Sequence, residues 1–102
     1  MARVTALCAF LVMAPLAHAA GDAEYGEYLS SQCVTCHQAS GADQGIPSII
    51  GWDAASFAAV MHAYKSKERV HPVMQMIAGG LDGEQIEALA AFYASLEPTN
   101  TQ

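Results

Sequence analysis

The sequence predicts an all-α domain of three main helices joined by loops. Three segments place apolar residues at the i, i+3, i+4 spacing of a helix face, and each begins just after an aspartate that can cap it. No segment shows the alternation of apolar and polar residues that is typical of a strand. The pentapeptide Cys-Val-Thr-Cys-His at residues 33–37 adds a third observation, because it indicates a bound group around which a small chain can fold.

The first 19 residues are expected to be a cleaved secretory signal peptide. Arg3 precedes a nearly unbroken apolar run over residues 4–16, and Ala17-His18-Ala19 has the small-x-small form of a cleavage site. The run is shorter than the ~20 residues of a membrane-spanning helix, although retention as an anchor is the alternative. The mature domain is then residues 20–102, exported to the periplasm without stable membrane insertion, and Cys8 is lost with the signal.

The charge of the expected mature domain is strongly negative. Only Lys65, Lys67 and Arg69 are basic, against ten acidic residues, which gives a net charge of about −7. Nucleic acid is therefore excluded as a natural partner. The three cations fall within five residues, so they either complement a helix C-terminus or form a patch that orients a partner or neutralises the acidic groups of a bound molecule.

The first helix is expected from Asp22 toward Cys33, with acidic residues in its first turn. Gly26 lowers helix propensity there, so it marks either close packing against another helix or a tolerated surface position. The predicted buried face consists of Tyr25, Tyr28 and Leu29.

A loop rich in glycine and proline follows over residues 38–51, and Asp53 then caps a second helix that extends to about Lys67. Pro72 is expected to break the helical path, so residues 70–80 are predicted to be a loop. The apolar stripe of the second helix consists of Phe57, Val60, Met61 and Tyr64.

The last helix is expected to open at Asp82, with Gln85 in capping-box spacing, and to end before Pro98. Its predicted buried face consists of Ile86, Leu89, Phe92, Tyr93 and Leu96. The chain has no visible repeat and no second domain.

The Cys-x-x-Cys-His pattern is that of covalent haem attachment. Cys33 and Cys36 stand one helical turn apart, so both thiols can add to one haem, and His37 can then ligate the iron. Two other interpretations stay open. A thiol–disulfide protein would normally need a βαβ context, and a structural zinc site would need four ligands, neither of which the chain supplies.

A six-coordinate haem needs a second axial ligand. After His37, the residues able to serve are Met61, His62, His71, Met74 and Met76. Met61 falls in a helical stripe and His62 on its outer side, so the segment 70–80 is the better source, and the residues alone leave its three candidates open.

The order of these segments resembles the small, single-haem class I c-type cytochromes, over essentially the whole of residues 22–96. The resemblance implies a helical fold around one covalent haem, with Met74, seven residues before Leu81, as the second ligand. It also implies that the Pro47 carbonyl accepts a hydrogen bond from the His37 imidazole. The resemblance further implies one-electron transfer and no enzymatic activity of the chain alone.

A finer likeness is carried by Pro-Ser-Ile at residues 47–49, by Tyr-Lys-Ser-Lys-Glu-Arg at 64–69 and by the segment that follows Met74. These segments are similar to the cytochrome subunits of flavocytochrome c sulfide dehydrogenases and to related cytochromes of sulfur oxidation. The resemblance implies an FAD-containing flavoprotein subunit as the redox partner. A free-standing carrier between periplasmic redox enzymes is the alternative.

Overall fold

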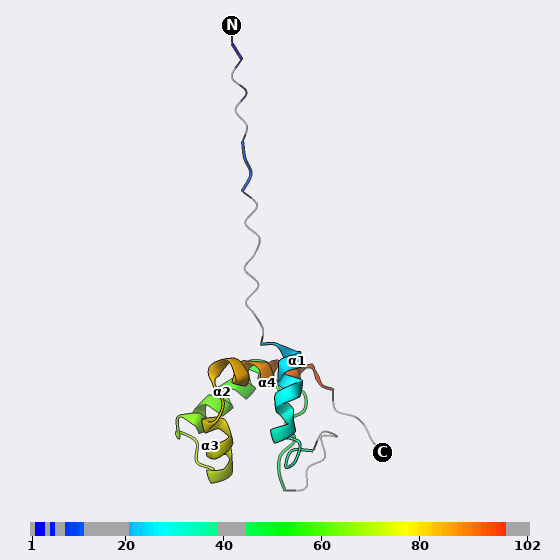
Figure 1. Ribbon diagram of the computed structural model, residues 1–102, viewed down its shortest axis with the longest axis vertical. Coiled ribbons are helices and arrows are strands. Elements are labelled where there is room, and N and C mark those ends of the chain that lie inside the picture. The colour runs from blue at the N-terminus through cyan, green and yellow to red at the C-terminus, as the bar shows by residue number, and fades with distance from the viewer. Residues whose placement is uncertain (1, 4, 6–7, 12–20, 39–44, 98–102) are drawn as a thin grey trace.

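The computed structural model describes residues 2–3, 5, 8–11, 21–38 and 45–97. Its helices are α1 (Ala23–Leu29), the short 3₁₀ turn η1 (Ser30–Gln32), α2 (Ala54–Lys65), α3 (Pro72–Gly79) and α4 (Gly83–Ser95), as Figure 1 shows. No strand occurs among the described residues, so the predicted all-α class is confirmed. None of the helices in this part of the chain is long and apolar enough to cross a bilayer.

The three expected helix starts all have the expected caps. Asp22 and Asp53 each accept a hydrogen bond at 3.0 Å from a backbone amide in the first turn of the helix that follows. Asp82 and Gln85 form a capping box, in which each side chain accepts from the other residue's amide, at 2.8 and 2.9 Å. A cap of this kind stabilises a helix by about 1 kcal/mol, so the short helices gain substantially from them.

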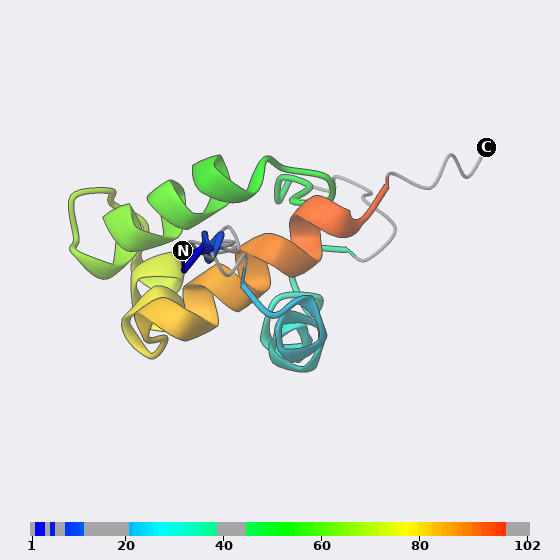
Figure 2. The same cartoon turned by 90° about the horizontal axis from the view of Figure 1, so that it is seen from above.

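Helix α4 lies in the middle of the bundle, between α1 and α2 (Figure 2). The crossing of α1 and α4 is very close at Gly26, where an added Cβ would lie 2.0 Å from the Ala88 carbonyl oxygen. No side chain fits in that space. Of the two roles expected for Gly26, close helix packing is therefore the one that the structure shows.

The core lies where α4 meets its neighbours. Ile86, Leu89 and Tyr93, all on the predicted face of the last helix, are its largest fully buried side chains. The prediction for Tyr28 was wrong, because this side chain is 77% exposed. Gly26 and Leu29 are the buried residues of α1, so Tyr28 lies off the contact face and stacks on the ring of Tyr25 instead, at 6.5 Å between centroids.

The segment 70–80, predicted as a loop, contains helix α3 (Pro72–Gly79). Pro72 does not break a helix here but occupies the first turn of a new one, where its missing amide hydrogen is not needed. The preceding helix α2 ends at Lys65, and Lys67, with φ of 68°, turns the chain away from it. The expected loop between two helices is thus a short helix with turns at each end.

Candidate haem site

The Cys-Val-Thr-Cys-His segment continues the path of α1 and η1 as one further helical turn. The amides of Cys36 and His37 both donate to the Cys33 carbonyl, at 3.1 and 2.7 Å. Cys33 and Cys36 are not joined in a disulfide, and Cys33 is buried while Cys36 is exposed. Two thiols and an imidazole are therefore held on a single short segment.

The His37 ring is fixed by a contact with the following loop. Its Nδ1 lies 2.7 Å from the carbonyl oxygen of Pro47. A carbonyl can only accept, so Nδ1 donates and carries the proton, which leaves the lone pair on Nε2. Metal-ligating histidines are commonly oriented by this type of hydrogen bond.

An apolar cavity of about 320 Å³ adjoins this turn, a volume within the ~300–1,000 Å³ of small-molecule sites. Cys33, Cys36 and His37 line it on one side, and the start of α3 lines it on the other. In Figure 1 these two segments stand on opposite sides of the lower part of the molecule. The predicted stripe of α2 supplies a third wall, formed by Phe57, Val60, Met61 and Tyr64.

The five candidates for a second ligand occupy different positions. Met61, His71 and Met74 line the cavity, whereas Met76 is 69% exposed on another side of α3 and His62 lies on the outer side of α2. Met61 is buried within the core cluster, and Met74 is half-buried and packs against that cluster. Nδ1 of His71 accepts a hydrogen bond from the Met74 amide at 3.3 Å and thereby caps α3.

The three basic residues do not form one patch. Arg69 lines the cavity, where its Nε donates to the Tyr64 hydroxyl at 3.0 Å and its guanidinium lies 5.3 Å from the centre of the Tyr64 ring. Lys65 instead donates to backbone carbonyls at the end of α3 and just after it, and Lys67 is exposed at the turn after α2. The sequence grouped the three residues and did not single out Arg69, because a residue past the end of a helix has no spacing signal.

Behind Cys33 lies a buried hydroxyl that the sequence did not indicate as part of the site. The Tyr93 side chain is 1% exposed, its ring stacks on Phe57 at 5.5 Å between centroids, and its hydroxyl has no hydrogen-bond partner among the described residues. Burial raises the pKa of Tyr93 and also that of the Cys33 thiol. The nearby Cys33 raises the pKa of Tyr93 further, whereas the Tyr93 hydroxyl lowers the pKa of Cys33 and offsets part of the effect of burial. The Tyr93 hydroxyl therefore lies close to one of the two thiols expected to hold the haem.

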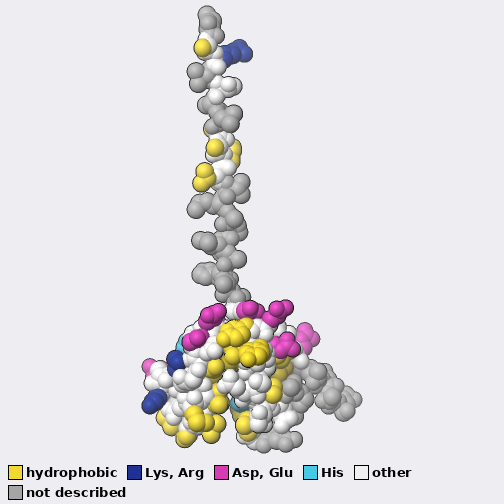
Figure 3. Space-filling view, viewed as in Figure 1, with side chains coloured by type: hydrophobic (Ala, Val, Ile, Leu, Met, Phe, Trp, Pro, Cys, Tyr) yellow, Lys and Arg dark blue, Asp and Glu magenta, His cyan; other side chains and the backbone are white. Residues whose placement is uncertain are grey.

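Charge is distributed unevenly around this site. Figure 3 shows acidic side chains gathered over α1 and the adjoining part of the bundle, with basic side chains at the α2 and α3 end.

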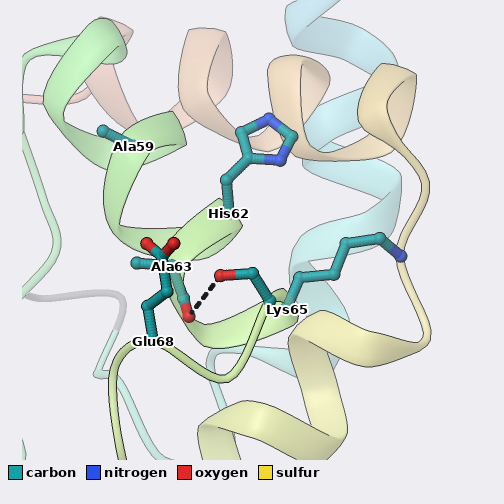
Figure 4. Close-up of a pocket in the computed structure, with 6 residues that line it drawn as sticks. Ala59, His62, Ala63, Lys65 and Glu68 are labelled. Atoms are coloured by element: carbon teal, nitrogen blue, oxygen red, sulfur yellow. Dashed lines mark hydrogen bonds between the residues drawn. The ribbon is translucent and has the colours of Figure 1, made fainter.

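An open depression on the outer side of α2, shown in Figure 4, contains no cysteine and lies apart from the thiols. In the described part of the chain, no three His, Cys, Asp or Glu residues are grouped so that they could hold a metal ion.

Comparison with known proteins agrees with this geometry, although no family model matches the chain. The chain is 35% identical to cytochrome c-554(548) of Halomonas halodenitrificans over an alignment of 85 residues, which covers 76% of this chain and the whole of that protein. It is 33% identical to the cytochrome subunit of sulfide dehydrogenase of Chlorobaculum tepidum, over 74% of this chain and 69% of the relative.

A thiosulfate dehydrogenase electron acceptor of Stutzerimonas stutzeri is 37% identical over 58% of this chain, but the match covers only 29% of that protein. The relatives from Halomonas halodenitrificans and Chlorobaculum tepidum are matched over more than two thirds of their length, and both are cytochromes. The chain belongs to the class I c-type cytochromes, and it is an electron-transfer protein that carries covalently bound haem c.

Proposed function

We propose that this chain transfers electrons in the periplasm through one haem attached to Cys33 and Cys36 and ligated by His37 and Met74. The observation that carries the proposal is the apolar cavity, because all four residues line it. The bound haem supplies one-electron chemistry between ferrous and ferric iron. Export follows from the signal peptide proposed for residues 1–19, and the mature domain is then residues 20–102.

The protein's part in this chemistry is to hold the haem and exclude water from it. The apolar wall from α2 and the segment 45–52 leaves little polar surface beside the iron, which favours the less charged ferrous form. The hydrogen bond from His37 to Pro47 keeps the imidazole in one tautomer and orients it. Arg69, held against Tyr64 at the cavity wall, is the basic side chain suited to neutralise a haem propionate.

Two observations favour Met74 over the other two candidates in its segment. The Met76 side chain points out of the cavity and is mostly exposed. The Nδ1 atom of His71 accepts a hydrogen bond, so in the neutral ring Nε2 carries the proton and offers no lone pair to a metal. A thioether ligand also raises the reduction potential relative to a second histidine.

A visible spectrum tests the attachment. Sharp reduced bands that survive extraction with acidified acetone are expected, because thioether bonds are covalent. The double variant Cys33→Ala and Cys36→Ala should yield protein without retained haem. A colourless protein with two titratable thiols would instead support the thiol–disulfide alternative.

The proposed partner is an FAD-containing subunit that oxidises sulfide. Its support is the match to a sulfide dehydrogenase cytochrome subunit over more than two thirds of that protein. A free-standing carrier is the second candidate, favoured by the match over the whole length of cytochrome c-554(548). Affinity purification of the tagged protein from its native cells separates the two, since a stable flavoprotein subunit would elute with the cytochrome and give a flavin spectrum.

A further inference from the structure

Helix α3 is too short to be stable by itself. It has eight residues, and isolated helices of fewer than ~12 residues are marginal in water. Contacts with the rest of the protein must therefore set its position. Since Met74 lies in the first turn of α3, those contacts also set the position of the Met74 sulfur.

The N-terminal end of α3 is held by hydrogen bonds to the segment before it. His71 caps the Met74 amide, and the Gln75 side chain donates to the Arg69 carbonyl at 3.1 Å. At the C-terminal end, the Gly80 amide donates to the Ile77 carbonyl at 3.2 Å and the Leu81 amide donates to the Ala78 carbonyl at 3.1 Å. These bonds stay within the turn itself, and α3 has no basic residue in its last turn. The carbonyl groups of Gly79 and Leu81, at the end of the helix and just after it, take their donors from elsewhere.

A lysine from another helix supplies those donors. Nζ of Lys65, in the last turn of α2, donates to the Leu81 carbonyl at 2.5 Å and lies 3.5 Å from the Gly79 carbonyl. Figure 4 shows the Lys65 side chain extending from α2 to the connection between α3 and α4. Hydrogen bonds from an ammonium are stronger than those between neutral groups, and the positive charge also complements the negative end of the α3 dipole.

We propose that Lys65 is a positioning residue that holds α3 against α2 and so keeps Met74 at the iron. The inference rests on the proposed ligation by Met74. Without Lys65, the C-terminal end of α3 keeps the hydrogen bonds of its own turn and the burial of Ala78 and Leu81, but it loses its hydrogen bonds to a side chain of α2, and the helix can move away from the cavity more often. Each such movement separates the methionine sulfur from the iron and leaves a coordination position open.

Binding of free imidazole to the ferric protein measures this movement. Imidazole competes with Met74, so its apparent affinity rises in proportion to the population in which the methionine is displaced. Lys65→Met removes the charge and the donors but keeps the apolar stem, and it should increase imidazole affinity roughly tenfold, as expected for loss of a charge-assisted hydrogen bond. Lys65→Arg keeps a cationic donor and should stay within about threefold of the wild type.

Lys67→Met is the matched control, since Lys67 is two residues away and its side chain makes no hydrogen bond within the described part of the chain. It should change imidazole affinity less than twofold, which is within the usual effect of a surface substitution. An equal increase in Lys65→Met and Lys67→Met would overturn the proposal, because a general loss of charge would then explain it.

Denaturant unfolding separates positioning from simple stabilisation. Lys65→Met with lower unfolding stability but unchanged imidazole affinity would also overturn the proposal. Met74→Ala serves as the reference for a fully open position and should bind imidazole more tightly than any lysine variant. If Met74→Ala binds imidazole no better than the wild type, then ligation by Met74 is itself wrong, and the proposal for Lys65 falls with it.

Discussion

The two walls of the haem cavity are built in different ways. The wall at residues 33–37 is a single turn, closed by backbone hydrogen bonds to Cys33, and a hydrogen bond from His37 to Pro47 joins it to the following loop. The opposite wall is α3, whose capping and end contacts come from His71, Arg69 and Lys65. One wall is determined by spacing within five residues, and the other by packing between helices.

This difference implies that the two walls respond differently to substitution. A substitution of Cys33, Cys36 or His37 removes a side chain that is proposed to hold the haem, and the same turn has no further residue of that kind to replace it. A change in α3 alters a helix that can shift as a unit, so the haem should stay attached while the occupancy of its sixth coordination position changes. The following predictions test that distinction.

The largest effect is expected for His37→Ala. The substitution removes the proposed first iron ligand together with the hydrogen bond to Pro47, so the yield of haem-containing protein should fall roughly tenfold or more. Absorbance of the haem relative to total purified protein measures it. His62→Ala, on the exposed side of α2, should give a normal yield. A normal yield for His37→Ala would mean that attachment of the haem at residues 33–37 does not require the histidine.

A smaller effect is expected for Met74→Ala. Haem should remain attached, because the thiols are untouched, but carbon monoxide should bind the reduced protein readily at the open position. Met76→Ala is the control, since that side chain is mostly exposed. The ligand assignment is wrong if Met74→Ala keeps the absorption band of methionine-ligated ferric haem while Met76→Ala loses it. Met61→Ala tests the other methionine at the cavity in the same way.

The sequence predicted those features of the structure that depend on residues close together along the chain. The aspartate caps and the apolar stripe of α2 follow from short-range spacing, and all are present in the structure. The role of Gly26 could be narrowed only to two possibilities, because the choice depended on which helix crosses it. The contact implied for Pro47 is present as well, although its effect on a bound haem stays a prediction.

The sequence did not predict those features of the structure that depend on contacts between residues far apart along the chain. Pro72 was interpreted as a helix breaker, yet a proline ends one helix or begins another according to where the next cap lies, and His71 supplies that cap. Tyr28 fits a helical stripe, but α1 turns it outward. The different environments of Lys65, Lys67 and Arg69 could not be predicted, because the three share a short segment and differ only in their distant contacts.

Arg69→Gln should shift the reduction potential moderately. Ferric haem carries one more positive charge than ferrous haem, so a cation at the cavity favours the ferrous form. Its removal should lower the potential by tens of millivolts, on the order of a partly screened charge interaction. Lys67→Gln removes the same charge from an exposed site, so its shift should be smaller and should vanish at high salt. Equal shifts for the two variants would mean that Arg69 affects the reduction potential no more than an exposed surface charge does.

The smallest effect concerns the buried hydroxyl behind the 33–37 turn. Burial raises the pKa of Tyr93 above the ordinary tyrosine value of about 10. Tyr93 should therefore stay protonated as the pH rises past that value, so Tyr93→Phe should leave the phenolate absorbance that develops up to about pH 11 unchanged.

The same shift has a consequence for stability. The folded chain holds the Tyr93 proton more tightly than the unfolded chain, so this contribution is complete below about pH 10 and decreases as the pH rises further. Near neutral pH, Tyr93→Phe should change the unfolding free energy by less than about 1 kcal/mol, because it removes a hydroxyl that has no partner among the described residues. A large loss near neutral pH would instead show that this hydroxyl is hydrogen-bonded once haem is attached, and the wall at residues 33–37 would then depend on α4 as well as on its own spacing.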